Sequence, residues 1–286
     1  MDGVNLQLLS DLHLESNPYF QPRAVPGADA LVLAGDIGSY QAGSLLDTLG
    51  VPDFGLARFS PLPLDQGGDG WPVPVLFVPG NHEYDGLEFD AAEDRLREAC
   101  ERLGLIWLQR RAVVLQGVRF LGCTLWSDFD ALAGATPGAP DAQRKAREKA
   151  FRAANFYLKN NHALRQGRPM LAEAMREESL KDQAWLRGAL AEPFGGPTVV
   201  VTHFAPSLLS ADPRYGITPG TAGFCNALDA LLPQASVWLH GHLHCPNDYV
   251  KHGCRVVANP LGYARKGEQQ AFRAGLRIGV PTPGAR

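Results

Sequence analysis

The sequence has little that would suit a membrane or a nucleic acid. It contains no run of about 18 or more consecutive apolar residues, so no membrane-spanning helix is expected. It also lacks an excess of basic charge, because the formal net charge is −3 and the pI is about 6.2. Proteins that bind duplex nucleic acid usually have a basic face and a high pI, so nucleic acid is disfavoured as a partner. Nothing in the sequence points to an obligate protein partner.

Cysteines are few and form no recognisable framework. The five cysteines include no CxxC pair, and a chain of 286 residues that is 45% hydrophobic can bury a large core without disulfides. The start of the sequence, Met1-Asp2-Gly3-Val4-Asn5, has neither the basic region nor the apolar region of a signal peptide. We therefore expect a cytoplasmic protein with free thiols.

Five short apolar runs end abruptly in polar residues, and this is the strongest organisational pattern in the sequence. Near-continuous apolar runs of this length are typical of strands that are buried on both faces, as in an α/β sandwich. In open α/β sheets, ligands bind beyond the carboxyl ends of the strands, so we expect the polar residues to gather there. The five predicted strands are Val4–Leu9, Ala30–Ala34, Val73–Val78, Thr198–Val201 and Val237–Leu239.

The segments between and after these strands favour further elements. Phe89–Leu103 has apolar residues at helical spacing, and Gly104 follows it as a C-cap. Two longer segments are charged and amphipathic, which indicates a pair of helices. The remaining predicted elements are strands at Leu105–Leu108, Ala112–Leu115 and Val118–Cys123, helices at Asp141–Arg165 and Leu171–Leu190, an edge strand at Phe272–Val280 and a frayed tail at Pro281–Arg286.

The residues that follow the five apolar runs are of the types that bind divalent metals. Each motif alone has a plain structural interpretation, since Asp11-x-His13 can be an ordinary loop and His203 a buried core histidine. Together they offer two aspartates, one asparagine and four histidines, which suit Mn, Fe or Zn, whereas a thiolate site would have used the cysteines. One ion cannot use seven ligands, but two ions about 3.5–4 Å apart that share a carboxylate can. The candidate ligands are Asp11, His13, Asp36, Asn81, His203, His242 and His244.

These residues belong to five motifs that stand in a fixed order: Asp11-x-His13, Gly35-Asp36, Gly80-Asn81-His82-Glu83, His203 and Gly241-His242-x-His244. In this order they resemble the calcineurin-like metallophosphoesterase superfamily, and in particular its small bacterial-type branch. The resemblance implies an α/β fold, a four-layer α/β/β/α sandwich, here with a helical insertion. It implies a metallophosphoesterase domain at residues 1–264 and a C-terminal edge strand and tail at 265–286. The insertion, residues 127–192, is either a cap over the site or an ordinary surface pair of helices.

The resemblance also implies two divalent metal ions, with manganese expected ahead of iron or zinc. Asp36 would bridge the ions. His82 would lie outside the metal shell, where it meets the phosphate and the leaving group. The other ligands would divide into Asp11, His13 and His244 for one ion and Asn81, His203 and His242 for the other.

The implied activity is that of a metal-dependent phosphoric ester hydrolase, either a phosphatase or a phosphodiesterase. A hydroxide that bridges the ions would attack a phosphomonoester or phosphodiester of a small molecule or nucleotide, because bound cations lower the pKa of water. His82 and Asp36 would be the catalytic residues, with Asn81 and His82 also in contact with the substrate. Further candidate contacts, for which a strand-end turn or a surface loop is at least as good an interpretation, are Asn259, Tyr263 and Arg214.

The residues around the bridging aspartate separate the branches of the family. The segment Gly35-Asp36-Ile37-Gly38-Ser39-Tyr40 lacks the Asp and Arg that the Ser/Thr protein phosphatases carry there, and Tyr40 stands one residue too far for the purple acid phosphatases. A cyclic-nucleotide phosphodiesterase stays open as a specific alternative. A non-catalytic metal-binding interaction module on the same scaffold and a single-metal amide hydrolase are alternatives from other classes, although the full ligand set favours catalysis.

Overall fold

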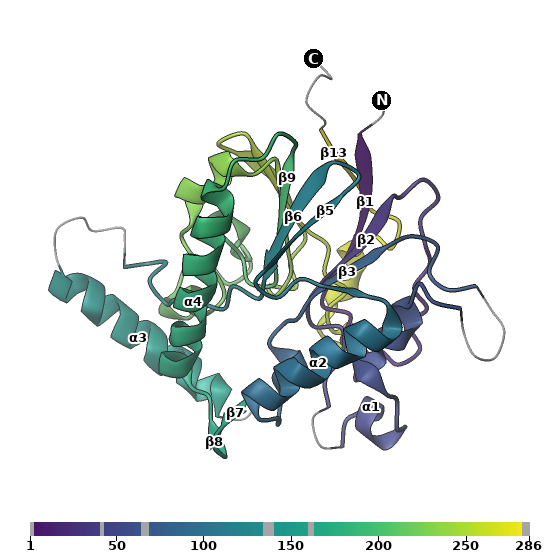
Figure 1. Ribbon diagram of the computed structural model, residues 1–286. Coiled ribbons are helices and arrows are strands. Elements are labelled where there is room, and N and C mark those ends of the chain that lie inside the picture. The colour runs from purple at the N-terminus through teal and green to yellow at the C-terminus, as the bar shows by residue number, and fades with distance from the viewer. Residues whose placement is uncertain (1–2, 41–42, 64–68, 134–139, 160–162, 282–286) are drawn as a thin grey trace.

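The computed structural model describes residues 3–40, 43–63, 69–133, 140–159 and 163–281, and two sheets form its centre (Figure 1). The first sheet contains β1 (Val4–Leu9), β2 (Ala30–Ala34), β3 (Val75–Val78), β4 (Ile106–Trp107) and β13 (Arg277–Val280). The second contains β5 (Arg111–Leu115), β6 (Val118–Cys123), β9 (Thr198–Thr202), β10 (Val237–His240), β11 (Asn247–Lys251) and β12 (Cys254–Ala258). Their orders are β13-β1-β2-β3-β4 and β11-β12-β10-β9-β6-β5.

Parallel pairing brings the polar strand ends to one edge. β1 to β4 run parallel, with Leu6 opposite Ala30 and Leu31 opposite Val75. In the second sheet β6, β9, β10 and β12 run parallel. The antiparallel edge strands are β5 and β11 of the second sheet and β13 of the first. Because parallel strands end at the same edge of a sheet, the loops after β1, β2, β3, β9 and β10 can converge on one site.

An apolar core fills the space between the two sheets. Successive side chains of a strand point to opposite faces, so alternate residues of each strand reach this layer. Leu6 and Val32 of the first sheet belong to the same buried cluster as Phe120 and Val199 of the second. The strand residues in between, such as Leu31, belong to a second buried cluster on the outer faces. Both faces of the sheets are therefore covered, as the near-continuous apolar runs predicted.

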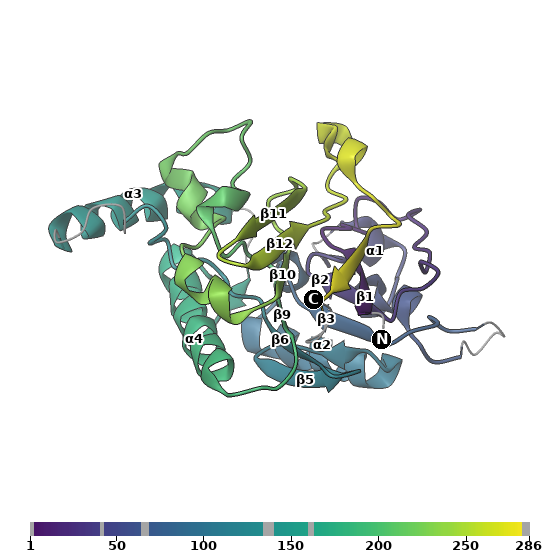
Figure 2. The same cartoon turned by 90° about the horizontal axis from the view of Figure 1, so that it is seen from above.

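Helices cover the outer faces of the sheets. α2 (Phe89–Leu103) lies beside the first sheet and α4 (Ala172–Ala191) beside the second (Figure 1, Figure 2). α2 buries an apolar stripe and ends at Gly104, which adopts φ 71° and caps the helix as predicted. The result is the predicted α/β/β/α sandwich. A short helix, α1 (Leu45–Thr48), begins at the N-cap Ser44.

The helical insertion differs in part from its prediction. The helix expected at Asp141–Arg165 is α3 (Pro140–Leu158), and Arg165 lies instead in a two-residue strand, β7 (Leu164–Arg165), paired with β8 (Arg168–Pro169). The turn at Gln166 and Gly167 has positive φ at both residues, which a helix cannot contain. Its two N–H groups donate to the carboxylate of Glu88, at the start of α2. Figure 1 shows α4 lying along the sandwich and α3 projecting from it.

The C-terminal part of the chain also differs in part from its prediction. β13 covers only Arg277–Val280 of the predicted Phe272–Val280, because Phe272 packs its ring against Phe20 at 5.8 Å and does not pair with β1. The hairpin of β11 and β12 was not predicted as a pair, since β11 is mostly polar and half-exposed. Most of the predicted tail, residues 282–286, lies outside the described residues.

From the sequence we expect neither a membrane-spanning helix nor a disulfide, and the described part of the chain bears on both expectations. None of its helices has the length and apolar composition that crossing a membrane requires. All five cysteines lie within it as free thiols, four of them buried. Burial raises the pKa of the Cys225 thiol to about 12, so this cysteine packs as a small apolar side chain.

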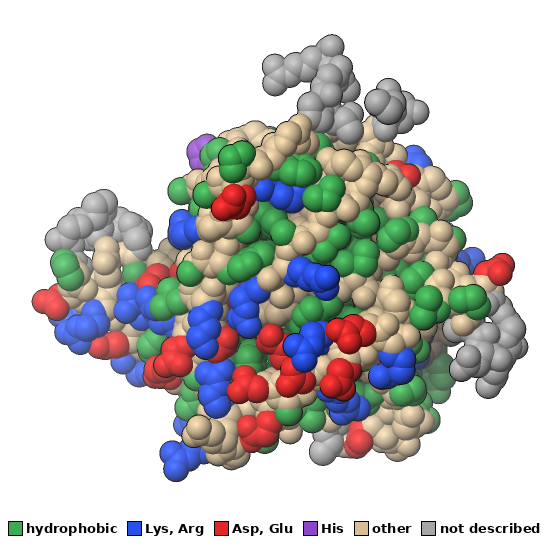
Figure 3. Space-filling view, viewed as in Figure 1, with side chains coloured by type: hydrophobic (Ala, Val, Ile, Leu, Met, Phe, Trp, Pro, Cys, Tyr) green, Lys and Arg blue, Asp and Glu red, His purple; other side chains and the backbone are tan. Residues whose placement is uncertain are grey.

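A buried ion-pair network joins α4 to its surroundings. Asp182 of α4 is fully buried and accepts hydrogen bonds from the N–H of Leu125 at 2.8 Å and from Arg110 at 3.0 Å. Arg110 also contacts Glu93 of α2 at 3.3 Å, so it links both outer helices. Over this part of the surface, basic and acidic side chains alternate (Figure 3). Burial raises the pKa of Asp182 to about 7, and Arg110 opposes this shift.

Replacement of Arg110 by methionine should lower the free energy of unfolding by about 3 kcal/mol at pH 8, because a buried carboxylate loses its cation. The loss should shrink towards pH 5. The folded-state pKa of Asp182 lies above its unfolded value, so protonation at lower pH favours the folded state. Urea denaturation at both pH values measures the effect. The matched control is Arg97→Met in an exposed pair with Asp94, expected to change stability by less than about 0.5 kcal/mol. A loss independent of pH would remove Asp182 as its cause.

Candidate metal centre

Loops after strands of both sheets place six of the seven predicted ligands in two groups. One group comprises Asp11, His13, Asp36 and His244, and the other comprises Asp36, His203 and His242. In each group the potential ligand atoms lie within 4.8 Å of one another. Asp36 belongs to both groups and lies between them.

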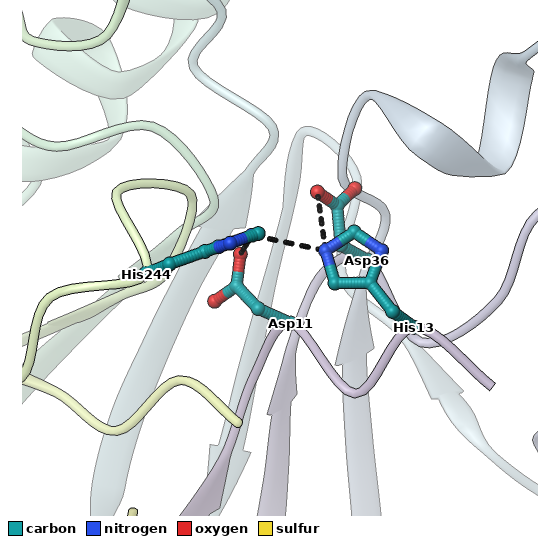
Figure 4. Close-up of side chains that lie close together, drawn as sticks. All are labelled: Asp11, His13, Asp36 and His244. Atoms are coloured by element: carbon teal, nitrogen blue, oxygen red, sulfur yellow. Dashed lines mark hydrogen bonds and ion pairs between the residues drawn. The ribbon is translucent and has the colours of Figure 1, made fainter. Parts of the chain in front are cut away.

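The first group is nearly enclosed by protein. Asp11 and His13 are fully buried and follow β1, whereas His244 comes from the loop after β10 (Figure 4). Nε2 of His13 lies 2.9 Å from Nε2 of His244 and 3.9 Å from Oδ2 of Asp36. Nε2 of His244 lies 3.5 Å from Oδ1 of Asp11. Four donor atoms from two sheets thus point at one small volume.

The second group continues from the other side of Asp36. Oδ2 of Asp36 lies 3.2 Å from Nε2 of His203, and the same nitrogen lies 3.2 Å from Oδ1 of Asn81. Nδ1 of His203 is 2.9 Å from the carbonyl oxygen of Ala34, so Nδ1 carries the hydrogen and Nε2 is left as the donor atom. His242 completes the group, with its ring packed on Phe204 at 3.9 Å between centroids. Oδ1 of Asn81 therefore lies beside this group.

Several atoms of both groups have the environment that a cation needs. Oδ2 of Asp11 and Nε2 of His242 are buried without a hydrogen-bond partner among the described residues. Nδ1 of His13 and Nδ1 of His244 each face a carboxylate, so the two Nε2 lone pairs point at each other across 2.9 Å. Two nitrogen ligands about 2.1 Å from one ion and at right angles are about 3.0 Å apart. These residues fit a bound divalent cation.

The pKa shifts of His203 and Asp36 indicate that the second group favours a positive charge next to Asp36. Burial lowers the pKa of His203, but Asp36 raises it by more, to about 9. Burial raises the pKa of Asp36, but His203 and His82 bring it well below its usual value. Burial and the neighbouring His203 hold the pKa of His242 well below normal, so His242 is neutral and can bind a metal.

His82 lies at the edge of the first group with its ring fixed. Nδ1 bonds the carboxylate of Asp85, the residue that directly follows the short 3-10 helix His82–Tyr84. The ring centroid lies 5.1 Å from that of His13, and the backbone N–H donates to Oδ1 of Asp36 at 2.9 Å. Burial lowers the pKa of His82, but Asp85 and Asp36 raise it by more, to well above normal. At this position, next to the two groups, a raised pKa would let His82 donate a proton.

Backbone strain is concentrated in these loops. Five predicted ligands have φ between 45° and 73°, a region that side chains other than glycine seldom occupy. The five are Asp11, His13, Asp36, His242 and His244. The carboxylate of Glu83 joins the loops after β2 and β3 by accepting the N–H groups of Asp36 at 3.0 Å and Gly80 at 2.6 Å. A side chain at Gly241 would begin 2.5 Å from Oδ2 of Asp11, so only glycine lets the chains approach this closely.

Sequence reasoning missed four carboxylates that hold the predicted residues. Glu15 contacts Nδ1 of His13 at 2.9 Å, and Glu268 contacts Nδ1 of His244 at 2.7 Å. Asp85 holds His82, and Glu83 holds the loop of Asp36. The short spacing of Glu15 and Asp85 from their histidines was an available signal. Glu268 is 24 residues from His244 and had none.

The three further candidate substrate contacts lie in different environments. Asn259 is 1% exposed, and its side chain bonds the backbone of Leu8 and Arg273, so it has a structural role and cannot contact a substrate. Tyr263 stacks on His13 at 4.3 Å and lies at the edge of the site. Arg214 is half-exposed and paired with Asp212 at 2.6 Å. Only Tyr263 touches a predicted ligand.

The helical insertion reaches the edge of the site. A cavity of about 20 Å³ lies between the loop after β3 and the insertion, and its free space would hold about one water. Nε1 of Trp126 is buried in its wall without a hydrogen-bond partner among the described residues. The lining residues are Asn81, Asp85, Trp126, Leu158, Ala163, Met170 and Met175. The cavity thus has a polar end at the metal centre and an apolar end at the insertion.

Comparisons with known proteins agree with this fold. A family model described as calcineurin-like phosphoesterase matches residues 6–246. The chain is 22% identical over 206 residues to an uncharacterised protein of Acanthamoeba polyphaga mimivirus, a match that covers 67% of this chain and 69% of the other. The structure is similar to that of a phosphopantetheinyl hydrolase from Mycobacterium tuberculosis, with a TM-score of 0.68 and 20% identity over 100% of this chain and 99% of the other. At this identity the structural likeness establishes a shared fold.

Proposed function

We infer that this chain, which belongs to the calcineurin-like phosphoesterase family and is a metal-dependent phosphoric ester hydrolase, uses two divalent cations to cleave a phosphomonoester or phosphodiester of a small molecule or nucleotide. The observation that carries this proposal is the pair of ligand groups that share Asp36. Asp11, His13 and His244 would hold one cation, and Asn81, His203 and His242 the other. We propose manganese for both positions, ahead of iron or zinc.

When bound, the cations supply an activated water and neutralise charge on the phosphate during displacement. Asp11 and Asp36 together carry two negative charges, fewer than the positive charges of two divalent ions. The two cations together with the side chains that would bind them directly are therefore net positive, which favours a phosphate although the whole chain has a net charge of −3. Asn81 turns its side-chain oxygen to His203, so its amide N–H₂ group is left to donate to a phosphate oxygen.

His82 would assist the departure of the leaving group. Asp85 accepts the hydrogen on Nδ1, which fixes the ring and directs Nε2 away from Asp85. A protonated Nε2 can donate to the leaving oxygen, and general acids of this kind typically contribute ~10²–10⁴-fold to the rate. The retention of His82 with all seven ligands supports catalysis over a non-catalytic interaction module.

We propose that part of the insertion, residues 127–192, caps the leaving-group side of the site. Its hairpin is tied to Glu88, and Met170 and Met175 line the small cavity next to Asp85, the partner of His82. Methionine side chains adapt readily to the shape of a bound group. An alcohol with an apolar portion would then lie against the insertion, while its phosphate lies on the metal centre.

The proposal predicts that removal of metal by a chelator lowers activity by at least about 10³-fold, and that manganese restores it with two ions per chain. Activity should be screened with Mn, Fe and Zn against phosphomonoesters, bis-p-nitrophenyl phosphate and cyclic nucleotides. The name of the similar structure adds phosphopantetheine esters to that screen. Activity on cyclic nucleotides alone would identify the specific alternative. One ion per chain in the active enzyme would contradict the two-cation proposal.

A further inference from the structure

A loop outside the segment that the family model matches packs across the first ligand group. This C-terminal loop, residues 259–273, is closed at its two ends by Asn259. The side-chain amide of Asn259 donates to the carbonyl oxygens of Leu8 at 2.8 Å and Arg273 at 2.9 Å, and its oxygen accepts from the N–H of Arg273 at 3.1 Å. The loop is therefore a fixed part of the fold.

The middle of the C-terminal loop is attached to the residues that follow β1. The N–H of Gly262 donates to the carbonyl oxygen of Asp11 at 2.9 Å, and Asn17 donates to the carbonyl oxygen of Gly262 at 3.1 Å. The ring of Tyr263 stacks on that of His13. The loop thus contacts two of the predicted ligands of the first cation.

Glu268 of the same loop contacts the third ligand. Its Oε2 lies 2.7 Å from Nδ1 of His244 and also accepts the N–H of Tyr263 at 2.8 Å. Nδ1 of His244 therefore carries the hydrogen, and the lone pair of Nε2 points towards Asp11 and His13. The side chain of Glu268 is 5% exposed, so water screens its charge only weakly.

Gly262 leaves the space that this contact needs. It adopts φ 69°, and an added Cβ would lie 2.7 Å from Cβ of Glu268 and 2.8 Å from its Oε2. Any other residue at position 262 would be strained and would displace the carboxylate from His244. The backbone of the loop is therefore shaped around the pair of Glu268 and His244.

We propose that Glu268 is a positioning residue of the metal centre, which increases the affinity of the first cation by orienting His244 and adding negative charge behind it. A carboxylate that accepts from the other ring nitrogen of a metal-binding histidine fixes its tautomer and raises its basicity, and removal typically costs 10–100-fold in metal affinity. The inference rests on the proposed metal centre of Asp11, His13 and His244.

The substitution Glu268→Gln removes the negative charge of this side chain but keeps its hydrogen bonds, because a glutamine oxygen can still accept from His244 and Tyr263. It should raise the Kd for manganese by about 10–100-fold. The chelator-treated full chain is titrated against a metal-sensitive indicator, and the melting temperature of the metal-free protein should stay within about 2 °C of the parent. The matched control is Glu177→Gln, an exposed residue of α4 whose loss should leave the Kd unchanged.

Two more variants complete the test. Gly262→Ala should weaken manganese binding without any change of charge, because it displaces Glu268. If Glu268→Gln binds manganese like the parent, the charge of Glu268 contributes nothing to the affinity. If Glu268→Ala does so as well, Glu268 does not position His244 and the inference is overturned. If the parent itself binds no manganese at this centre, the proposed function fails along with the inference. That failure is recognised in the parent, before any variant is compared.

Discussion

Replacement of Asp36 by asparagine is expected to lower kcat/KM by about 10³-fold or more and to reduce the metal content below two ions per chain. Asp36 is the residue that both ligand groups share, with Oδ2 3.2 Å from Nε2 of His203 and 3.9 Å from Nε2 of His13. Asparagine keeps one oxygen but loses the negative charge and the second carboxylate oxygen, so it cannot bridge two cations. Stabilisation of the transition state by bound metal is worth several kcal/mol, and each ~1.4 kcal/mol is tenfold in rate.

Metal analysis of the purified variant and kinetics under saturating manganese measure these two effects. Folding should survive, because the asparagine oxygen can still accept the N–H of His82 that now donates to Oδ1 of Asp36. Asp248→Asn, in a surface pair with Arg255, is the matched control and should behave like the parent. An Asp36→Asn protein that retains two ions and full activity would exclude Asp36 from the bridging position.

Replacement of His82 by alanine is expected to lower kcat by ~10²–10⁴-fold for esters of alkyl alcohols. The loss should be smaller for p-nitrophenyl esters, because a good leaving group needs less help from a proton donor. The metal content should stay at two ions per chain, since His82 lies outside both ligand groups. Kinetics with paired alkyl and aryl substrates, alongside metal analysis, distinguish this role from that of a ligand.

Two variants control for this experiment. Asp85→Asn should reproduce part of the loss on alkyl esters, because Asp85 holds Nδ1 of His82. His252→Ala removes an exposed histidine from the turn between β11 and β12 and should have no effect. If His82→Ala hydrolyses both kinds of ester as fast as the parent, the role of His82 as proton donor is wrong.

The parts of the fold that were predicted from sequence are those in which local pattern and burial agree. Val4–Leu9, Ala30–Ala34 and Val118–Cys123 have the predicted bounds because both of their faces are buried, so the apolar run and the strand coincide. The helix expected at Asp141–Arg165 extended seven residues past the end of α3 at Leu158. The charged, amphipathic composition continues past Leu158, so it gives no sign that the helix ends there. The chain reverses at Gly167 because of the backbone conformation of a single turn, which composition does not reveal.

The candidate site could be predicted to the extent that its residues follow strands. All seven predicted ligands and His82 do so, and parallel pairing is enough to bring them to one edge of the sandwich. The carboxylates behind the histidines were missed, because hydrogen bonds between side chains leave no periodic trace in a sequence. Glu268 reaches His244 only because the C-terminal loop folds back along β1, a contact fixed by the tertiary structure.

Because the candidate ligands come from both sheets, bound metal would affect the stability of the fold as well as the reaction. Asp36 follows a strand of the first sheet, and His203 and His242 follow strands of the second, so a cation held by these residues would connect the two sheets. Ions that bind only the folded chain also stabilise it by mass action. The metal-free chain would therefore be less stable and more easily cut by proteases. The amount of enzyme in a cell would then fall when metal is scarce.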